Sequence, residues 1–225
     1  MVARLNHIRN WIFDLDNTLY PARASLFVQI EARMTDYVAN HLGLDRVEAR
    51  RVQKQYFHAH GTTLAGMMVA HGVDPHEFLE FVHDVDLSVI GHNAALAEAI
   101  GRLPGRRLVF TNGDAPYAAK VLARLGLADV FDGIYDVHAM DYLPKPHPSA
   151  YAGLVAAFGV DPGKSLFADD MTRNLKPAKD LGMMTVWVDN GSEQGPAGED
   201  LGTAHHDFVD VSTADITHWL NEILE

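Results

Sequence analysis

The sequence predicts an α/β fold: a parallel sheet with helices on both faces, and an all-helical insert of four helices directly after the first strand. From residue 91 onward, short apolar runs alternate with segments of helical periodicity, which is typical of βαβ units and a parallel sheet. Before that point, four helical segments follow one another with no strand between them. We therefore expect two domains, one made of residues 1–19 and 92–225 and the other of residues 20–91.

The first strand, residues 11–13, is apolar and ends in a motif with two aspartates, Asp14-Leu15-Asp16-Asn17-Thr18. In an extended chain, residues two apart point to the same side, so Asp14 and Asp16 can both face one ligand. Asn17 and Thr18 favour a tight turn instead, which would expose backbone N–H groups beside the acids. Either arrangement suits a divalent cation that holds a phosphate, because Mg²⁺ commonly takes one or two carboxylates plus substrate oxygens. The alternative is an ordinary acidic turn, since Asp and Asn are frequent in turns.

The insert is predicted from helical periodicity and from helix-capping residues. In its first segment, apolar residues recur at spacings of three and four, which describes one face of a helix. The other three segments each begin with Asp or Thr, residues that cap the N-terminus of a helix. The four expected helices cover residues 21–42, 45–60, 62–71 and 74–82.

The second half of the chain completes the predicted sheet. Its strands are short apolar runs, and glycine or proline separates most of them from the helices between them. Residues 189–204 are rich in Gly, Pro, Asp and Glu, so we expect a loop there. The expected elements are a helix over 93–103, a strand over 106–111, a helix over 115–125, a strand near 134–135, helices over 148–158 and 174–181, strands over 165–168, 184–188 and 207–209, and a terminal helix from 212.

The alternating strands and helices predict a Rossmann-like core. Polar residues follow several of the strands, which predicts a site at one edge of the sheet. Asp14 and Asp16, Thr111-Asn112, Lys145 and Asp169-Asp170 all fall just past expected strand ends. Because the carboxyl ends of parallel strands meet at one edge, four separate stretches converge on one pocket. Each stretch alone has an ordinary explanation, such as a solvated lysine or a helix N-terminal acid pair.

Composition limits the class of protein. The chain has 225 residues, 48% of them hydrophobic, which is enough to bury a sizeable core. Its formal net charge of -12 argues against a nucleic acid polymer as partner. The absence of cysteine excludes disulfides, thiolate nucleophiles and Cys-ligated zinc. No run approaches the length of a membrane span, so we expect a cytoplasmic protein without membrane partners. We expect a monomer or homodimer, and the negative net charge does not exclude a small phosphorylated substrate.

The order of the four stretches is similar to that in the haloacid dehalogenase-like (HAD) hydrolase superfamily. The superfamily pattern has an acidic DxDxT motif, then Ser or Thr at a strand end, then Lys, then an acidic pair, as in this chain. The segments FDLDNTLYP, TNGD, DYLPKPHP and DDMTRNLKPAKDLGMMTVWV further resemble the pyrimidine 5′-nucleotidase branch. That branch places a helical cap between the first and second motifs, which matches the position of the predicted insert.

The resemblance implies a Mg²⁺-dependent phosphomonoesterase that works through an aspartyl-phosphate, and it implies a role for each residue. Asp14 is the expected nucleophile and Asp16 the expected acid and base. Lys145 is expected to point at Asp14 and the phosphoryl oxygens, and Thr111 to donate a hydroxyl to the same oxygens. The N–H groups of Leu15 and Asn112 are expected around the phosphate, and Tyr20, Gly61, Thr62 and Thr63 toward the leaving group. The expected metal ligands are Asp14, the Asp16 carbonyl and Asp170. Asp169 is expected in the outer shell of the metal, and Asn174 is expected to support the acidic loop.

The expected substrate is a pyrimidine nucleoside 5′-monophosphate. A sugar phosphate or phosphoglycolate is the alternative within the same superfamily. A different class is a phospho-acceptor switch that keeps its aspartyl-phosphate, although Asp16 argues against it because an acid and base at this position accelerates hydrolysis. A dehalogenase is disfavoured because hydrolysis at carbon makes no use of Asp16 or of the acidic pair Asp169-Asp170.

Overall fold

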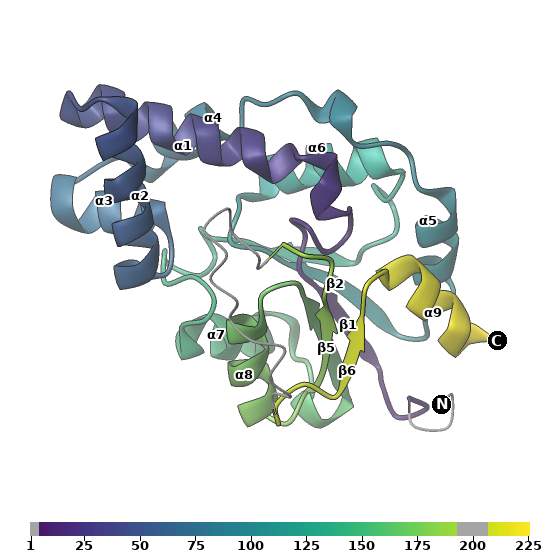
Figure 1. Cartoon of the computed structure of the whole chain (residues 1–225). Helices are drawn as coiled ribbons and strands as arrows, with labels where there is room; N and C mark the ends of the chain where they lie inside the picture. Colours follow the sequence, from purple (N-terminus) through teal and green to yellow (C-terminus); the bar gives the residue numbers. More distant parts are fainter. Residues whose placement is uncertain (1–4, 193–206) are drawn as a thin grey trace.

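The computed structural model describes residues 5–192 and 207–225, and its centre is a six-stranded sheet (Figure 1). The strand order is β3-β2-β1-β4-β5-β6, and every neighbouring pair is parallel. The predicted α/β class with a Rossmann-like parallel sheet is therefore confirmed. The strands are β1 (Asn10–Phe13), β2 (Arg106–Phe110), β3 (Gly133–Tyr135), β4 (Ser165–Asp169), β5 (Met184–Val188) and β6 (Val211–Thr213).

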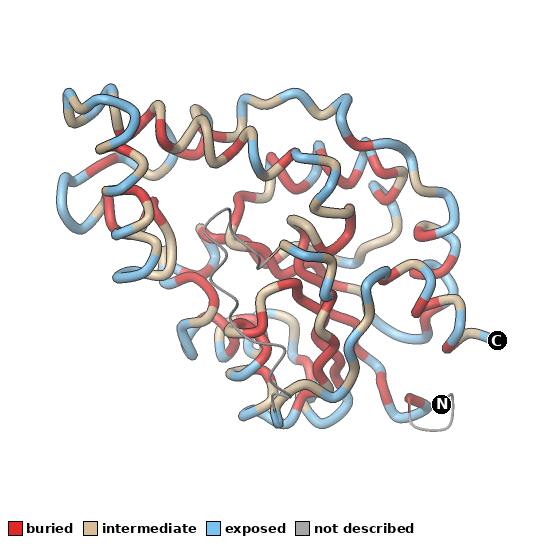
Figure 2. Tube along the Cα trace, viewed as in Figure 1, coloured by how far each residue is buried: buried red, intermediate tan, exposed pale blue. Residues whose placement is uncertain are grey.

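Alternate residues of the central strands pack into two apolar clusters, one on each face of the sheet. In β1, Trp11 and Phe13 belong to the cluster shared with α5, α6 and α9, whereas Ile12 belongs to the cluster shared with α7 and α8. This period of two places both faces of the sheet in the core, as Figure 2 shows for the central strands. The covering helices are α5 (Ala94–Gly101), α6 (Ala115–Leu125), α7 (Pro148–Phe158), α8 (Thr172–Asp180) and α9 (Ile216–Leu224).

The first four of the five α-helices between β1 and β2 form the insert. They share an apolar cluster that includes Tyr37, Met67, Phe78 and Val82, and Val137 from the loop after β3 joins it. The predicted capping residues begin three of the helices, because the side chains of Asp45, Thr62 and Asp74 accept backbone N–H groups of the first turn. The exact domain boundaries at residues 20 and 91 stay a prediction. The helices are α1 (Leu26–Leu42), α2 (Arg46–His60), α3 (Thr63–His71) and α4 (Pro75–Val82), with short 3-10 turns at Ala22–Ala24, Leu87–Val89 and Pro162–Lys164.

The last strand lies later in the chain than predicted. We expected it at residues 207–209, but β6 covers Val211–Thr213 and pairs with β5 from Val186 onward. The preceding segment is bound to β5 through the side chain of Thr185, which donates its hydroxyl to the Phe208 carbonyl oxygen. Asp210 in turn accepts the Thr185 N–H, so the regular ladder starts only after this side-chain contact.

Most of the loop predicted over residues 189–204 lies outside the described residues. Within residues 5–192 and 207–225, none of the helices combines the length and apolar character that a bilayer crossing requires.

Candidate active site

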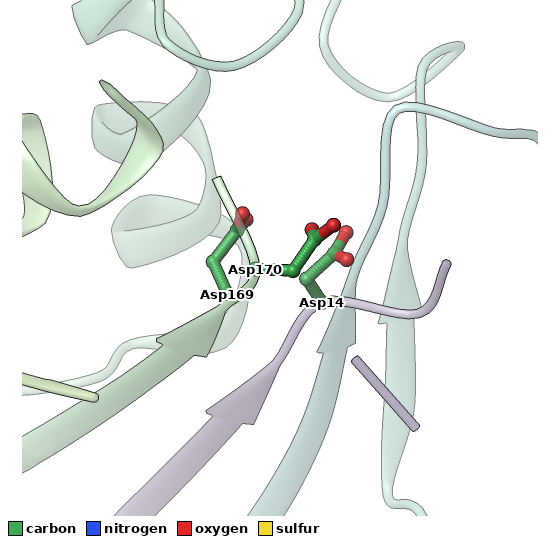
Figure 3. Close-up of side chains that lie close together, drawn as sticks. All are labelled: Asp14, Asp169 and Asp170. Carbon is green, nitrogen blue, oxygen red and sulfur yellow. The ribbon is translucent and has the colours of Figure 1, made fainter. Parts of the chain in front are cut away.

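Three carboxylates gather where β1 and β4 end. Asp14 follows β1 directly, and its N–H donates to the Ala168 carbonyl oxygen of β4 at 2.9 Å, so the two strand ends are held together. Asp169 is the last residue of β4 and Asp170 the next. One oxygen from each carboxylate lies within 4.8 Å of the others, and all three residues are buried (Figure 3). The structure thus brings together acids that are more than 150 residues apart in sequence.

The ammonium of Lys145 lies between two of these acids. Its Nζ donates to Asp14 Oδ1 and to Asp169 Oδ2, both at 2.7 Å, and to the Phe110 carbonyl oxygen at 2.8 Å. Lys145 is 1% exposed, and the rings of Phe110 and Phe167 lie 5.0 and 5.3 Å from its Nζ. Lys145 contacts Asp14 as predicted. Its three donor protons all point at protein oxygens. The expected bond to a phosphoryl oxygen stays a prediction.

Burial of so many charges changes their acidity. Burial raises the pKa of Asp14 to about 7, with further increases from Asp169 and Asp16, while Lys145 opposes the rise. Burial also raises the pKa of Asp170 well above its ordinary value, and Asp169 and Asp14 add to the effect. For Lys145, burial alone would lower the pKa, but the charges of Asp14 and Asp169 outweigh it and raise the pKa. The Lys145 ammonium therefore stays charged. Its single positive charge does not bring the pKa values of Asp14 and Asp170 back to their ordinary range.

The donor set fits a hard divalent cation. If all three buried carboxylates were ionised, their negative charge would exceed the charge of the one ammonium, which bonds to Asp14 and Asp169. All the available ligand atoms are oxygens, which suit Mg²⁺ or Ca²⁺. Bound there, a cation would supply the missing positive charge and lower the pKa of the acids around it.

Asp169 is the most fully bonded acid of the cluster. Its Oδ1 accepts the Met171 N–H at 2.8 Å, and the side-chain amide of Asn174 donates to both carboxylate oxygens at 3.0 and 3.1 Å. Together with the Lys145 bond, these contacts leave less room for a direct metal bond than at Asp14 or Asp170. Asn174 therefore holds the acidic loop from α8, which agrees with the supporting position predicted for it.

The end of β2 supplies polar groups to the same place. Thr111 is fully buried, and its Oγ1 accepts the Gly113 N–H at 3.0 Å. Asn112 and Lys145 form a reciprocal pair: the Asn112 amide donates to the Lys145 carbonyl oxygen at 3.0 Å and accepts the Lys145 N–H at 2.9 Å. Among the described residues, the backbone N–H groups of Leu15 and Asn112 donate to no carbonyl or side chain. These two donors are therefore available to an anion, as a phosphate cradle requires.

Asp16 turns toward two tyrosines. The hydroxyls of Tyr20 and Tyr117 both donate to Asp16 Oδ1, at 2.6 and 2.7 Å. Both rings are buried, at 2% exposure. Tyr20 is thus buried beside Asp16, and its expected place toward the leaving group stays a prediction. Burial, followed by the charge of Asp16, raises the pKa of both phenols, so both remain hydrogen-bond donors.

The predicted turn Gly61-Thr62-Thr63 of the insert lies beside the loop of Lys145. A Cβ built on Gly61 would lie 3.6 Å from Pro144 and 3.9 Å from the Lys145 carbonyl oxygen. Thr62 uses its hydroxyl to cap α3 by accepting the Ala65 N–H at 3.1 Å, and Thr63 is buried at 3% exposure. The turn is thus close to the site, but its two hydroxyl side chains have structural contacts.

Sequence reasoning missed two residues of this site. Thr18 donates its hydroxyl to Asp14 Oδ2 at 3.0 Å, and Tyr117 reaches Asp16 from α6. The sequence signal for Thr18 is its place in the DxDxT motif. Tyr117 lies three residues after Asp114, the cap of the helix that follows the polar end of β2. That position places Tyr117 near the site, but the sequence does not specify the direction of its side chain.

Two known proteins are similar in sequence to this chain. Phosphoglycolate phosphatase of Yersinia pseudotuberculosis is 26% identical over an alignment of 229 residues. The alignment covers 96% of this chain and 94% of that protein. Phosphate metabolism protein 8 of Saccharomyces cerevisiae is 25% identical over 191 residues, and this alignment covers 77% of the chain but only 59% of the yeast protein.

A solved structure and a family model give the wider relationship. The HAD phosphatase from Thermococcus onnurineus has the same fold, with a TM-score of 0.64 and 19% identity over 96% of this chain and 98% of that one. The sequence model of the haloacid dehalogenase-like hydrolases matches residues 8–182, which contain the acids, the lysine and the insert. The chain therefore belongs to the haloacid dehalogenase-like hydrolases.

Proposed function

We propose that this hydrolase is a Mg²⁺-dependent phosphomonoesterase that forms an aspartyl-phosphate on Asp14. The observation that carries the proposal is the buried cluster of Asp14, Asp169 and Asp170 around Lys145, with Asp16 two residues from Asp14. A carboxylate nucleophile needs nearby positive charge to approach a phosphate dianion. The lysine supplies part of that charge, and the acids are arranged to bind a cation that supplies the rest.

In the first step, a carboxylate oxygen of Asp14 attacks phosphorus. A new O–P bond forms on Asp14 while the P–O bond to the leaving group breaks, and Asp16 donates its proton to the leaving oxygen. Lys145 and Thr18 each hold one oxygen of Asp14, which fixes the carboxylate for the attack. The N–H groups of Leu15 and Asn112 and the Thr111 hydroxyl are the proposed donors to the phosphoryl oxygens.

In the second step, water attacks the aspartyl-phosphate. Asp16, now a carboxylate, takes a proton from the water as the new P–O bond forms and the bond to Asp14 breaks. This step returns Asp14 and Asp16 to their starting states and releases inorganic phosphate.

Asp14, Asp170 and the backbone carbonyl of Asp16 are the proposed Mg²⁺ ligands, with Asp169 contributing through water. When bound, Mg²⁺ supplies positive charge that offsets the repulsion between the carboxylate and the phosphate. The four bonds that Asp169 accepts, one each from Lys145 and Met171 and two from Asn174, support its place outside the direct ligand set.

For the substrate, we propose a pyrimidine nucleoside 5′-monophosphate. The support is the resemblance of FDLDNTLYP, TNGD and the DYLPKPHP loop to the pyrimidine 5′-nucleotidase branch. Phosphoglycolate is the second candidate, because the similarity to phosphoglycolate phosphatase covers 96% of the chain. Neither a dehalogenase nor a non-hydrolysing phospho-acceptor accounts for Asp16 beside the nucleophile.

A release assay tests the proposal. Purified protein with Mg²⁺ is given CMP, UMP, phosphoglycolate, p-nitrophenyl phosphate or 2-chloropropionate, and phosphate or chloride is measured. We expect many turnovers of phosphate, lost in EDTA and restored by Mg²⁺, with CMP and UMP hydrolysed fastest. Faster hydrolysis of phosphoglycolate favours the second candidate. Chloride release, or a single stoichiometric burst of p-nitrophenol, contradicts the proposed phosphomonoesterase.

A further inference from the structure

Two tyrosines from different parts of the chain donate to the same oxygen of Asp16. Tyr20 lies in the segment that leads from β1 into the insert, and Tyr117 lies in the first turn of α6. Their hydroxyl oxygens are 2.6 and 2.7 Å from Asp16 Oδ1, which are short O–H···O hydrogen bonds. Among the described residues, Asp16 Oδ2 accepts no hydrogen bond. One oxygen is therefore fixed, and the other is free to carry a proton.

A residue of the insert is packed against this pair. His83 follows α4, and its ring stacks on Tyr117 with the ring centroids 4.2 Å apart and the planes at 12°. His83 Nδ1 also lies 2.9 Å from Asp114 Oδ1, the carboxylate that caps the helix of Tyr117. The side chains of His83 and Asp114 are only 9% and 13% exposed. Tyr117 is therefore held from two sides, by Asp16 in the core and by His83 in the insert.

We propose that Tyr20 and Tyr117 are positioning residues for the acid and base Asp16, and that His83 connects the insert to this pair through Tyr117. The inference rests on the proposed phosphomonoesterase function. A side chain with rotatable bonds loses efficiency as a proton donor when it samples several rotamers. Two bonds to Oδ1 restrict Asp16 to one direction while leaving Oδ2 for the leaving group.

The simpler explanation is that two buried phenols have found an acceptor. That explanation accounts for the bonds but not for their convergence on one oxygen of the proposed catalytic acid, nor for the stack on His83. The two explanations differ in their effect on the reaction. If the tyrosines only satisfy their own hydroxyls, removing a hydroxyl changes stability alone.

Leaving-group dependence distinguishes them. An alkoxide leaves only with a proton, whereas p-nitrophenolate leaves without one, so a poorly placed acid slows alkyl substrates selectively. The experiment compares kcat/KM for p-nitrophenyl phosphate with that for CMP or phosphoglycolate, whichever the wild type hydrolyses faster. We expect Tyr20→Phe and Tyr117→Phe each to lower the alkyl value by about 10- to 100-fold and the aryl value by less than about threefold. His83→Ala is expected to lower the alkyl-to-aryl ratio by about 2- to 10-fold.

Tyr135→Phe is the matched control. Tyr135 is also buried, and its hydroxyl donates to the Ala139 carbonyl oxygen, away from Asp16, so the ratio should stay at the wild-type value. Circular dichroism and thermal unfolding establish that each variant is folded. Equal losses on both substrates, or no loss, overturn the positioning role. An unchanged ratio in His83→Ala overturns the connection to the insert. A wild type that releases no phosphate instead contradicts the function on which the inference rests.

Discussion

At the carboxyl end of the sheet the charged side chains are buried, whereas in the insert they lie at the surface. Lys145, Asp169 and Asp170 are at most 4% exposed, and the Lys145 ammonium donates to the Asp169 carboxylate. In the insert, the side chains of the ion pair Arg51–Glu48 are 64% and 42% exposed. The insert is stabilised instead by its apolar cluster and by capped helix ends.

This difference in burial indicates which substitutions each region tolerates. Buried charges are unfavourable unless they are paired, so the acidic cluster costs stability, a cost that the proposed chemistry would explain. Exposed pairs contribute little, and the insert can vary in sequence while its cluster and caps remain. The two regions contact each other at Arg173 of α8, whose guanidinium lies 4.1 Å from the ring centroid of Phe57 in α2.

The largest expected effect is the loss of turnover in Asp14→Asn. The amide keeps the size of the side chain but is no nucleophile, so we expect phosphate release to fall by on the order of 10⁴-fold or more. Glu48→Gln in the insert, which removes an exposed charge, should leave turnover unchanged. Release of phosphate from p-nitrophenyl phosphate measures both. Activity of Asp14→Asn within about tenfold of wild type contradicts the nucleophilic role.

The second effect concerns stability. Lys145→Met leaves Asp14 and Asp169 buried without their cation, so we expect a loss of about 3–5 kcal/mol in the free energy of unfolding without metal. Lys176→Met is the control, because its partner Asp180 and its own side chain are 62% and 58% exposed. Urea unfolding in EDTA gives both values. Equal stability of the two variants would mean that the buried ammonium does not compensate the acids.

Some features of these two regions could be predicted from the sequence, depending on which residues interact to form them. Helix ends in the insert depend on neighbours three residues away, so the caps at Asp45, Thr62 and Asp74 could be predicted. The meeting of Asp14 with Asp169 and Asp170 could also be predicted, because parallel strands bring their carboxyl ends to one edge.

The directions of several site side chains and the position of the last strand could not be predicted from the sequence. The sequence does not show that the donors of Lys145 are all used within the protein, or that Tyr20 and Tyr117 point to one oxygen of Asp16. The strand β6 has only three residues, and its register depends on bonds from Thr185, far away in sequence. Local apolar character at residues 207–209 therefore gave the wrong position.

The pH dependence of stability is the third expected effect. Burial raises the pKa of Asp14 from its ordinary value of 3.8 to about 7 in the metal-free protein. Between these values the unfolded chain binds fewer protons than the folded one, so this contribution to stability falls as the pH rises. Asp14→Asn stays neutral and lacks the contribution. In EDTA, we expect the variant to gain stability relative to wild type from about pH 4 to about pH 7. A difference that is constant across this range contradicts the raised pKa.

The smallest expected effect separates two roles for Thr62, at the point where the insert lies beside the Lys145 loop. As the cap of α3 it accepts the Ala65 N–H, so Thr62→Ala should cost about 1 kcal/mol of unfolding free energy. Thr62→Ser keeps the hydroxyl and should restore that stability, and KM for CMP should stay the same in both variants. A role in substrate binding predicts the opposite pattern, with KM raised in Thr62→Ala and stability unchanged. Urea unfolding and steady-state kinetics on the same three proteins therefore decide whether this turn of the insert acts on the fold or on the substrate.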